Sequence, residues 1–180
     1  MNNSMAYSHF PFERVVLAGL AGGAAEVAWV SLFSTLTPVS GIEVARQVTA
    51  SVMPAVAGFA LAPVLGIVIH FVLSLALACA FAGTLRLSFL HGPDRTEIMA
   101  GAVMLLCTVW FVNFFVVLPV LNPSFIDLMP YEVTFVSKIL FGVAMASVLV
   151  GSFDSRARGG TALGAHSAFC RSPLNERSIW

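Results

Sequence analysis

The sequence predicts an all-α membrane protein, a bundle of four transmembrane helices with a short interfacial helix between spans 1 and 2. Hydrophobic residues make up 58% of the 180 residues, charged residues only 10%, and the mean hydropathy is +0.92. Soluble domains are about half apolar and a quarter charged. Four separate apolar runs of at least 18 residues are present, and about 20 residues suffice to cross a hydrocarbon core roughly 30 Å thick. One membrane domain with short flanking segments therefore accounts for the chain.

The first span is predicted at residues 15–37, after a cytoplasmic N-terminal segment of residues 1–14. A cleavable signal peptide is the alternative. Arg14 is the only early cation, however, and Glu26 lies inside the apolar run, which is unlike the apolar core of a signal peptide. We therefore expect a retained transmembrane helix.

A short amphipathic helix is predicted between the first two spans. Ser40 and Glu43 fit a capping box at its start. Apolar residues then recur at near-helical spacing, while charged and amide side chains occupy the other faces; the apolar positions are Ile42, Ala45, Val48 and Val52. This pattern is typical of a helix lying at the membrane surface, and Pro54 ends it.

The remaining spans are predicted at residues 64–85, 98–118 and 133–150. Pro119 marks the exit from the third span, and residues 122–132 are predicted to form a loop without Lys or Arg. Residues 151–180 are rich in Gly, Ser, Ala and Arg and lack apolar periodicity. They are predicted to form a mobile cytoplasmic tail.

The distribution of cations predicts the orientation. Seven arginines lie on the side that holds both chain ends, namely Arg14, Arg86, Arg95, Arg156, Arg158, Arg171 and Arg177, whereas Arg46 alone lies on the other side. Short cytoplasmic segments retain cations during insertion. We therefore expect a multi-pass protein of the bacterial inner membrane with both termini cytoplasmic. The formal net charge of zero offers no attraction for nucleic acid.

Each predicted span carries one strongly polar residue, and these four residues form the candidate site: Glu26, His70, Asn113 and Lys138. At 1.5 Å per residue they lie about 17, 22, 22 and 18 Å from the cytoplasmic end of their spans. A charge at the membrane centre costs at least about 2.5 kcal/mol. We therefore predict that Glu26 and Lys138 form an ion pair, with His70 and Asn113 completing its hydrogen bonds.

Small residues indicate which helix faces pack together, because close helix contacts in lipid favour them. The predicted packing positions are Gly19, Gly22, Gly23, Gly66, Ser74, Ala78, Gly142 and Ala146. The first and third of these form a GxxxG pair. These faces are expected to pack against the chain's own helices or against another protein.

Neither enzymatic chemistry nor a cofactor or metal is expected. The sequence contains no GxSxG, HExxH, P-loop or GxGxxG pattern. His70 is the single histidine within a span, and Cys79 and Cys107 have no CxxC partner. Two interpretations of the four polar residues of the candidate site remain. They form either a structural clamp that orders the bundle, or a site in which a carboxylate near an imidazole passes protons or coordinates a cation.

Several segments resemble a family of uncharacterised bacterial inner-membrane proteins typified by YagU. They are the glycine-rich residues 19–25, the segment 66–71, and the exit from the third span through Pro119 into residues 122–127. The resemblance implies a four-helix inner-membrane protein and carries no established activity. Relatives carry histidines in the third and fourth helices where this chain has Asn113 and Lys138, so histidine chemistry is not expected to carry over.

Two functions follow as expectations. The first is a small polytopic protein of accessory, assembly or structural type, which contacts the lipid bilayer and either its own copies or a partner in a membrane complex. The alternative is a small oligomeric transporter or proton-coupled channel that uses the four mid-membrane polar residues.

Overall fold

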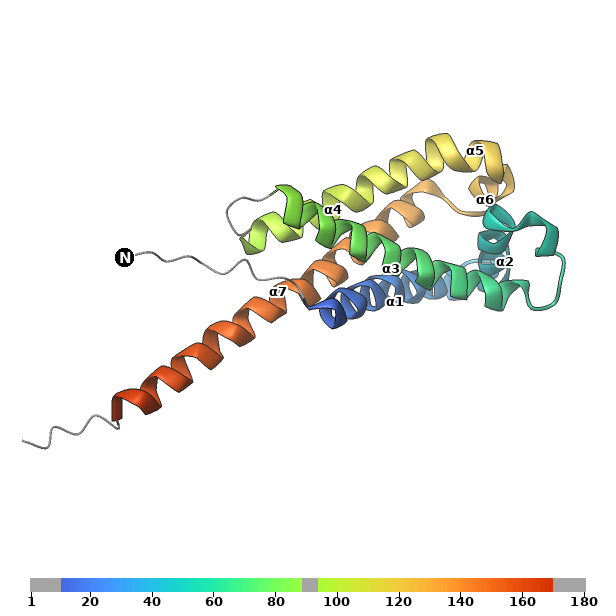
Figure 1. Ribbon diagram of the computed structural model, residues 1–180. Coiled ribbons are helices and arrows are strands. Elements are labelled where there is room, and N and C mark those ends of the chain that lie inside the picture. The colour runs from blue at the N-terminus through green and yellow to red at the C-terminus, as the bar shows by residue number, and fades with distance from the viewer. Residues whose placement is uncertain (1–10, 89–93, 170–180) are drawn as a thin grey trace, which may run out of the picture.

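The computed structural model describes residues 11–88 and 94–169, and side chains within them for residues 11–86 and 94–151. The described residues form helices (Figure 1). The elements are α1 (Phe12–Leu36), α2 (Gly41–Val52), the 3-10 turn η1 (Pro54–Val56), α3 (Ala62–Ser88), α4 (Arg95–Val112), the π-helical turn η2 (Asn113–Val117), α5 (Leu118–Leu121), α6 (Pro123–Leu128) and α7 (Tyr131–Phe169). Within the described residues, four helical segments are long and apolar enough to cross a membrane: Phe12–Leu36, Ala62–Arg86, Arg95–Leu121 and Tyr131–Gly151. The predicted fold class is therefore confirmed.

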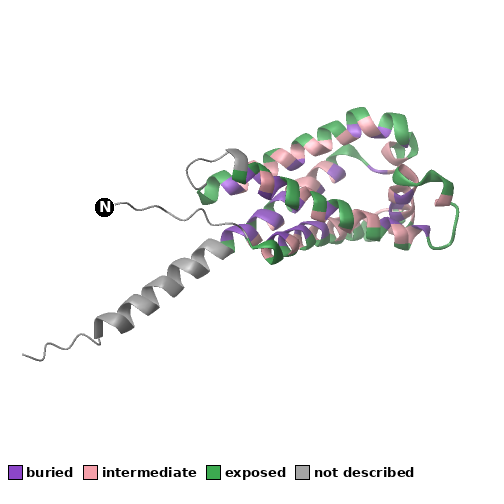
Figure 2. Cartoon of the chain, in the orientation of Figure 1, coloured by how far each residue is buried: buried purple, intermediate pink, exposed green. Residues whose placement is uncertain are grey.

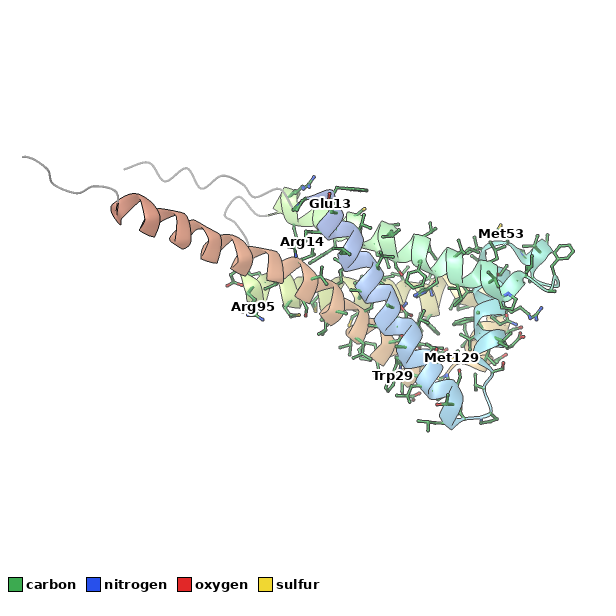
Figure 3. The ribbon with its side chains drawn as sticks, turned by 90° about the horizontal axis from the view of Figure 1, so that it is seen from below. Glu13, Arg14, Trp29, Met53, Arg95 and Met129 are labelled. Atoms are coloured by element: carbon green, nitrogen blue, oxygen red, sulfur yellow. The ribbon has the colours of Figure 1, made fainter. Side chains whose placement is uncertain are left out.

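The four spans alternate in direction. The start of α1, the end of α3 and the start of α4 lie at one end of the bundle, whereas α2, α5 and α6 lie at the other (Figure 1). Figure 3 shows Arg14 and Arg95 at the first end and Met53 and Met129 at the second. An even number of crossings thus brings the two ends of the membrane domain to the same side.

The spans pack in the order α3, α1, α7, α4. Helix α1 packs along both α3 and α7, and α7 packs along α4. Helices α3 and α4 share few contacts, among them Phe81 against Gly101, and they diverge from the end at which the chain joins them (Figure 1). The bundle is therefore a row of helices with a wedge between its first and last members.

Small residues bring the helices together. A Cβ at Gly19 would lie 3.1 Å from the Leu75 Cα, one at Gly22 would lie 2.6 Å from the Phe141 ring, and one at Gly142 would lie 3.1 Å from the Val103 Cα. All eight residues predicted to pack are buried: Gly19, Gly22, Gly23, Gly66, Ser74, Ala78, Gly142 and Ala146. Their neighbours belong to this same chain, so their faces are used within the bundle.

The buried core occupies the half of the bundle that holds the starts of α1 and α4 and the end of α3. Its residues come from α1, α3, α4 and α7, namely Val15, Ala18, Ala78, Phe81, Ala82, Leu85, Ile98, Ala102, Leu106, Phe141, Met145, Ala146, Leu149 and Val150. The outward faces of the helices expose large apolar side chains such as Leu17, Val72 and Val116 (Figure 2). In water such a surface would be costly, whereas in a bilayer it contacts lipid.

Helix α2 occupies the predicted place, but its cap and buried face differ from those predicted. Ser40 makes no capping hydrogen bond; Glu43 instead pairs with Arg46 at 3.2 Å. The buried residues are Val44, Ala45 and Thr49, whereas Ile42 is 67% and Val52 53% exposed. The reason is the packing of α2 against α3. The α2 backbone at Ala45 contacts α3 at Gly66, where a Cβ would lie 1.9 Å from the Ala45 carbonyl oxygen, and this contact determines which face of α2 is buried.

The third span is longer at both ends than the predicted residues 98–118. It begins at Arg95, where Asp94 and Glu97 form a capping box that the sequence reading missed. It also continues past Pro119 to Leu121, because the helix widens into the π turn η2 and the Leu118 N–H bonds to the Asn113 carbonyl. This turn accommodates a proline that supplies no N–H of its own. The predicted loop at residues 122–132 contains the short helix α6.

The fourth span ends at Gly151, next to the predicted residue 150, and helix α7 continues beyond the span to Phe169. Alanine and arginine favour helix, and the next proline is Pro173, so helical hydrogen bonding propagates out of the span. The mobility of residues 151–180 stays a prediction, and residues 170–180 lie outside the described residues. Of the predicted N-terminal segment, residues 12–14 already belong to α1, and residues 1–10 are not described.

Candidate functional site

A cavity of about 350 Å³ lies between the membrane spans, in the half of the bundle remote from the core. Helices α1, α3 and α7 and the turn η2 surround it, and α2 and α6 contribute its outer wall. The four polar residues predicted at mid-membrane all line this cavity: Glu26, His70, Asn113 and Lys138. The divergence of α3 from α4 provides the space, because the wedge between them is not filled by another helix.

An ion pair joins α1 to α7 at the cavity wall. The Lys138 Nζ lies 2.5 Å from the Glu26 Oε1, as the sequence predicted. The Ser137 hydroxyl donates a second hydrogen bond, of 3.2 Å, to the same oxygen. The other carboxylate oxygen, Glu26 Oε2, is buried and has no hydrogen-bond partner among the described residues.

His70 and Asn113 do not complete the hydrogen bonds of this pair, contrary to the prediction. The His70 Nε2 lies 3.1 Å from the Gly23 carbonyl oxygen. Because a carbonyl only accepts, Nε2 donates, which leaves Nδ1 of a neutral ring as an acceptor. Asn113 begins the π turn η2, a feature frequent at functional sites, and its side chain makes no hydrogen bond to the part of the chain that the structure describes.

Ser137 is the neighbour of the ion pair that sequence reasoning missed. It is 1% exposed and precedes Lys138 directly on α7. Thr134 lies three residues earlier and also lines the cavity, so these residues form one polar face of a helix. That spacing was visible in the sequence, but a serine in a span also bonds to its own helix, as Ser137 does to the Thr134 carbonyl at 2.7 Å.

Two tryptophans hold the start of α7. The Trp29 Nε1 of α1 donates to the Val133 carbonyl at 2.9 Å, and the Trp110 Nε1 of α4 donates to the Thr134 hydroxyl at 3.0 Å. These bonds fix the depth of α7 relative to α1 and α4, and thereby the height at which Lys138 meets Glu26.

Helix α2 is held over the cavity by hydrogen bonds from the loop after the third span. The Asn122 Nδ2 lies 3.0 Å from each of three acceptors, the Gln47 carbonyl, the Gln47 Oε1 and the Ser51 hydroxyl. The Thr49 hydroxyl donates to the Ala62 carbonyl at 2.6 Å. The sequence showed no signal for Asn122, because its partners lie more than 70 residues away.

The rim of the cavity is apolar. Ile67 and Leu73 of α3 are 38% and 51% exposed, and Leu121 of α5 is 59% exposed, although all three line the cavity. At the depth of membrane spans, exposure means contact with lipid. The cavity therefore has polar groups inside and an edge that faces the bilayer.

Within the described residues, no three His, Cys, Asp or Glu side chains are placed so that they could hold a metal ion. No family model, curated protein or solved structure matches the chain. Fold and site together define a class: a multi-pass α-helical membrane protein with an ion pair in the wall of an intramembrane cavity. Apolar walls with a few convergent polar groups are typical of small-molecule sites.

Proposed function

We propose that the protein is a polytopic protein of the bacterial inner membrane that binds a small molecule in the cavity beside Glu26, as a transporter or carrier does. One observation carries the proposal: the Glu26–Lys138 pair lines a cavity of about 350 Å³ and leaves Glu26 Oε2 buried without a partner. Small-molecule sites range from about 300 to 1,000 Å³, so the volume suits such a ligand.

A purely structural clamp accounts less well for these facts. Protein interiors are packed as densely as organic crystals, and buried polar atoms are nearly always hydrogen-bonded. A clamp that served only stability would gain from filling the cavity and from satisfying both carboxylate oxygens. Retaining the space and one unsatisfied oxygen costs stability, which is typical of functional sites.

The structure gives less support to an accessory or assembly role than the sequence alone gave. That role relied on the GxxxG and small-residue faces as surfaces for another protein. Gly19 and Gly23 instead contact Ser74 and Ala78 of α3, and Gly142 contacts α4. The small-residue faces that motivated a partner are therefore occupied inside the chain.

Both termini are proposed to be cytoplasmic. The end of the bundle that holds Arg14, Arg86 and Arg95 is the one that retains cations, whereas Arg46 alone lies at the other end. In this orientation α2 covers the cavity from the periplasmic side, and the buried core closes the cytoplasmic half. The proposed YagU-like relationship adds no activity, and we propose binding or transport without a catalytic step.

The test is a cavity-filling substitution with a matched control. Val48 of α2 lines the cavity, so Val48→Phe places a ring in it; Val68 of α3 is 53% exposed and does not line it, so Val68→Phe adds the same bulk outside. Each protein is purified in nanodiscs, and its organic extract is compared by mass spectrometry. We expect a species enriched over bulk lipid with wild type and Val68→Phe and lost with Val48→Phe. Identical extracts from all three, or no enriched species in wild type, would contradict the proposal.

A further inference from the structure

The cavity borders the wedge between α3 and the third span (Figure 1), and this border decides which molecules reach it. We infer that the ligand is an uncharged amphiphile dissolved in the membrane, that it enters sideways through the wedge, and that its polar end is held between His70 and Asn113. The inference rests on the proposed function, since it assumes that the cavity binds a small molecule. It adds the route of entry, the charge of the ligand and the residues that recognise its polar end.

Each side of the wedge presents one stripe of residues to the cavity. The members of a stripe are three or four positions apart, as on one helix face; they are Ile67, His70 and Leu73 on α3 and Asn113, Val117 and Leu121 on the third span. Ile67, Leu73 and Leu121 are exposed, and at the depth of the spans exposure means contact with lipid. The two stripes therefore border an opening to the bilayer, which we call the portal.

The two ends of the bundle offer no comparable path from water. At one end the buried core fills the space between the helices. At the other end α2 covers the cavity, because its backbone at Ala45 contacts α3 at Gly66 and the Asn122 Nδ2 lies 3.0 Å from three acceptors on α2. A molecule dissolved in lipid meets the portal directly, so the membrane is the source that suits this cavity.

Two polar side chains beside the portal have unused hydrogen-bonding capacity. The Asn113 amide makes no hydrogen bond to the described residues, and the His70 ring uses Nε2 on the Gly23 carbonyl, which leaves Nδ1 as an acceptor. Both residues are half-buried; the fully buried side-chain atoms without a partner are, among the described residues, Glu26 Oε2 and Ser34 Oγ. The free atoms of His70 and Asn113 therefore keep accessible surface. A polar group that both accepts and donates, such as a primary amide, satisfies them.

The charge and the body of the ligand follow from the rest of the lining. Glu26 and Lys138 pair at 2.5 Å, and no further Asp, Glu, Lys or Arg of the described residues lines the cavity. A charged ligand would leave one charge uncompensated in a medium of low dielectric constant, which is costly. Most of the remaining wall is apolar, with residues such as Val30, Val117 and Phe125. An uncharged polar end inside and an apolar chain in the portal match these surroundings.

The test is photolabelling of the purified full-length protein in nanodiscs with two probes. Both probes are hexadecanamides with one diazirine, which lies beside the amide in the head probe and at the far end of the chain in the tail probe. Mass spectrometry locates the adducts. We expect the head probe to label inner residues such as Val30 and Phe125, and the tail probe to label Ile67, Leu73, Leu121 or lipid. Tail-probe adducts inside with head-probe adducts at the portal would overturn the inferred orientation.

Substitutions at the portal test the route. Leu73 and Val72 are neighbours on α3 and both are exposed, but only Leu73 lines the cavity. Leu73→Trp should abolish the cavity adducts, and Val72→Trp, the matched control, should leave them unchanged. Ser31 of α1 is also exposed and lines the cavity, so it marks the alternative route. Loss of adducts in Ser31→Trp but not in Leu73→Trp would overturn the portal while leaving the cavity as a binding site.

Competition against the head probe tests the polar end. Hexadecanamide should compete about two- to tenfold better than hexadecane, because the alkane makes no hydrogen bond, and hexadecyltrimethylammonium and hexadecanesulfonate should compete no better than the alkane. Asn113→Leu keeps the size of the side chain and should reduce the preference for the amide. Best competition by a charged compound, or an unchanged preference in Asn113→Leu, would overturn the assignment of the polar end. Adducts that stay unchanged in Val48→Phe would instead reject the cavity, and with it the proposed function.

Discussion

The Lys138 Nζ lies 2.5 Å from the Glu26 Oε1, although the two residues are 112 positions apart in the chain. Removing one partner leaves a buried charge uncompensated, which costs about 3–5 kcal/mol, whereas replacing both with apolar side chains is often neutral. Lys138→Met alone should therefore strongly lower the free energy of unfolding, and Glu26→Leu with Lys138→Met should restore it to near wild type. Unfolding in mixed micelles followed by tryptophan fluorescence measures both. A double variant as unstable as Lys138→Met would show that the charges do not act as a pair.

The contact between α2 and α3 depends on a glycine. A Cβ at Gly66 would lie 1.9 Å from the Ala45 carbonyl oxygen, whereas one at Gly83, on the same helix, meets nothing within 4 Å. Gly66→Ala should separate the two helices and lower the unfolding temperature, despite the gain in helix propensity. Gly83→Ala is the matched control and should stabilise by up to about 1 kcal/mol. Equal melting temperatures for the two variants would contradict the close approach.

Asn122 is expected to matter for stability, and Asn113 is not. The Asn122 amide lies 3.0 Å from three acceptors on α2, so Asn122→Ala should cost about 1–3 kcal/mol. Asn113→Ala, an equal truncation within the third span, should stay within about 0.5 kcal/mol. Denaturant midpoints compare the two, and limited proteolysis in α2 should increase only for Asn122→Ala. A larger loss of stability in Asn113→Ala than in Asn122→Ala would mean that α2 is held by other contacts.

The orientation can be tested by cysteine labelling. In a background of Cys79→Ala, Cys107→Ala and Cys170→Ala, single cysteines are introduced at two exposed positions, Phe59 in the loop after α2 and Thr96 at the start of α4. If the arginine-rich end is cytoplasmic, a membrane-impermeant maleimide should label Phe59→Cys in intact spheroplasts and Thr96→Cys only after permeabilisation. Labelling of Thr96→Cys in intact spheroplasts would reverse the topology.

The heights of the polar residues could be predicted from the sequence because helical rise is constant. Counting 1.5 Å per residue placed Glu26, His70, Asn113 and Lys138 in one layer, and the structure places all four around one cavity. Their hydrogen bonds could not be predicted in the same way. Whether Ser137 or His70 reaches the carboxylate depends on helix rotation and tilt, and helix propensity and hydropathy constrain neither.

The third span also has one feature that the sequence predicted and one that only the tertiary structure shows. Pro119 correctly indicated a disturbance, but sequence rules place a helix end there, whereas the structure continues to Leu121 through the π turn that begins at Asn113. The rings that pack against Phe114 of this turn, Phe125 of α6 and Tyr131 of α7, are known only from the tertiary structure.

By itself, the sequence determined that the chain crosses a bilayer four times and carries two opposite charges at matching depth, since apolar length and helical rise are local properties. The tertiary structure decided that α3 and α4 diverge, that α2 turns Ala45 rather than Ile42 inward, and that Glu26 Oε2 stays without a partner beside a cavity. These features depend on which helices become neighbours. That choice is made by the close contacts of Gly19, Gly66 and Gly142, whose partners lie far away in the chain.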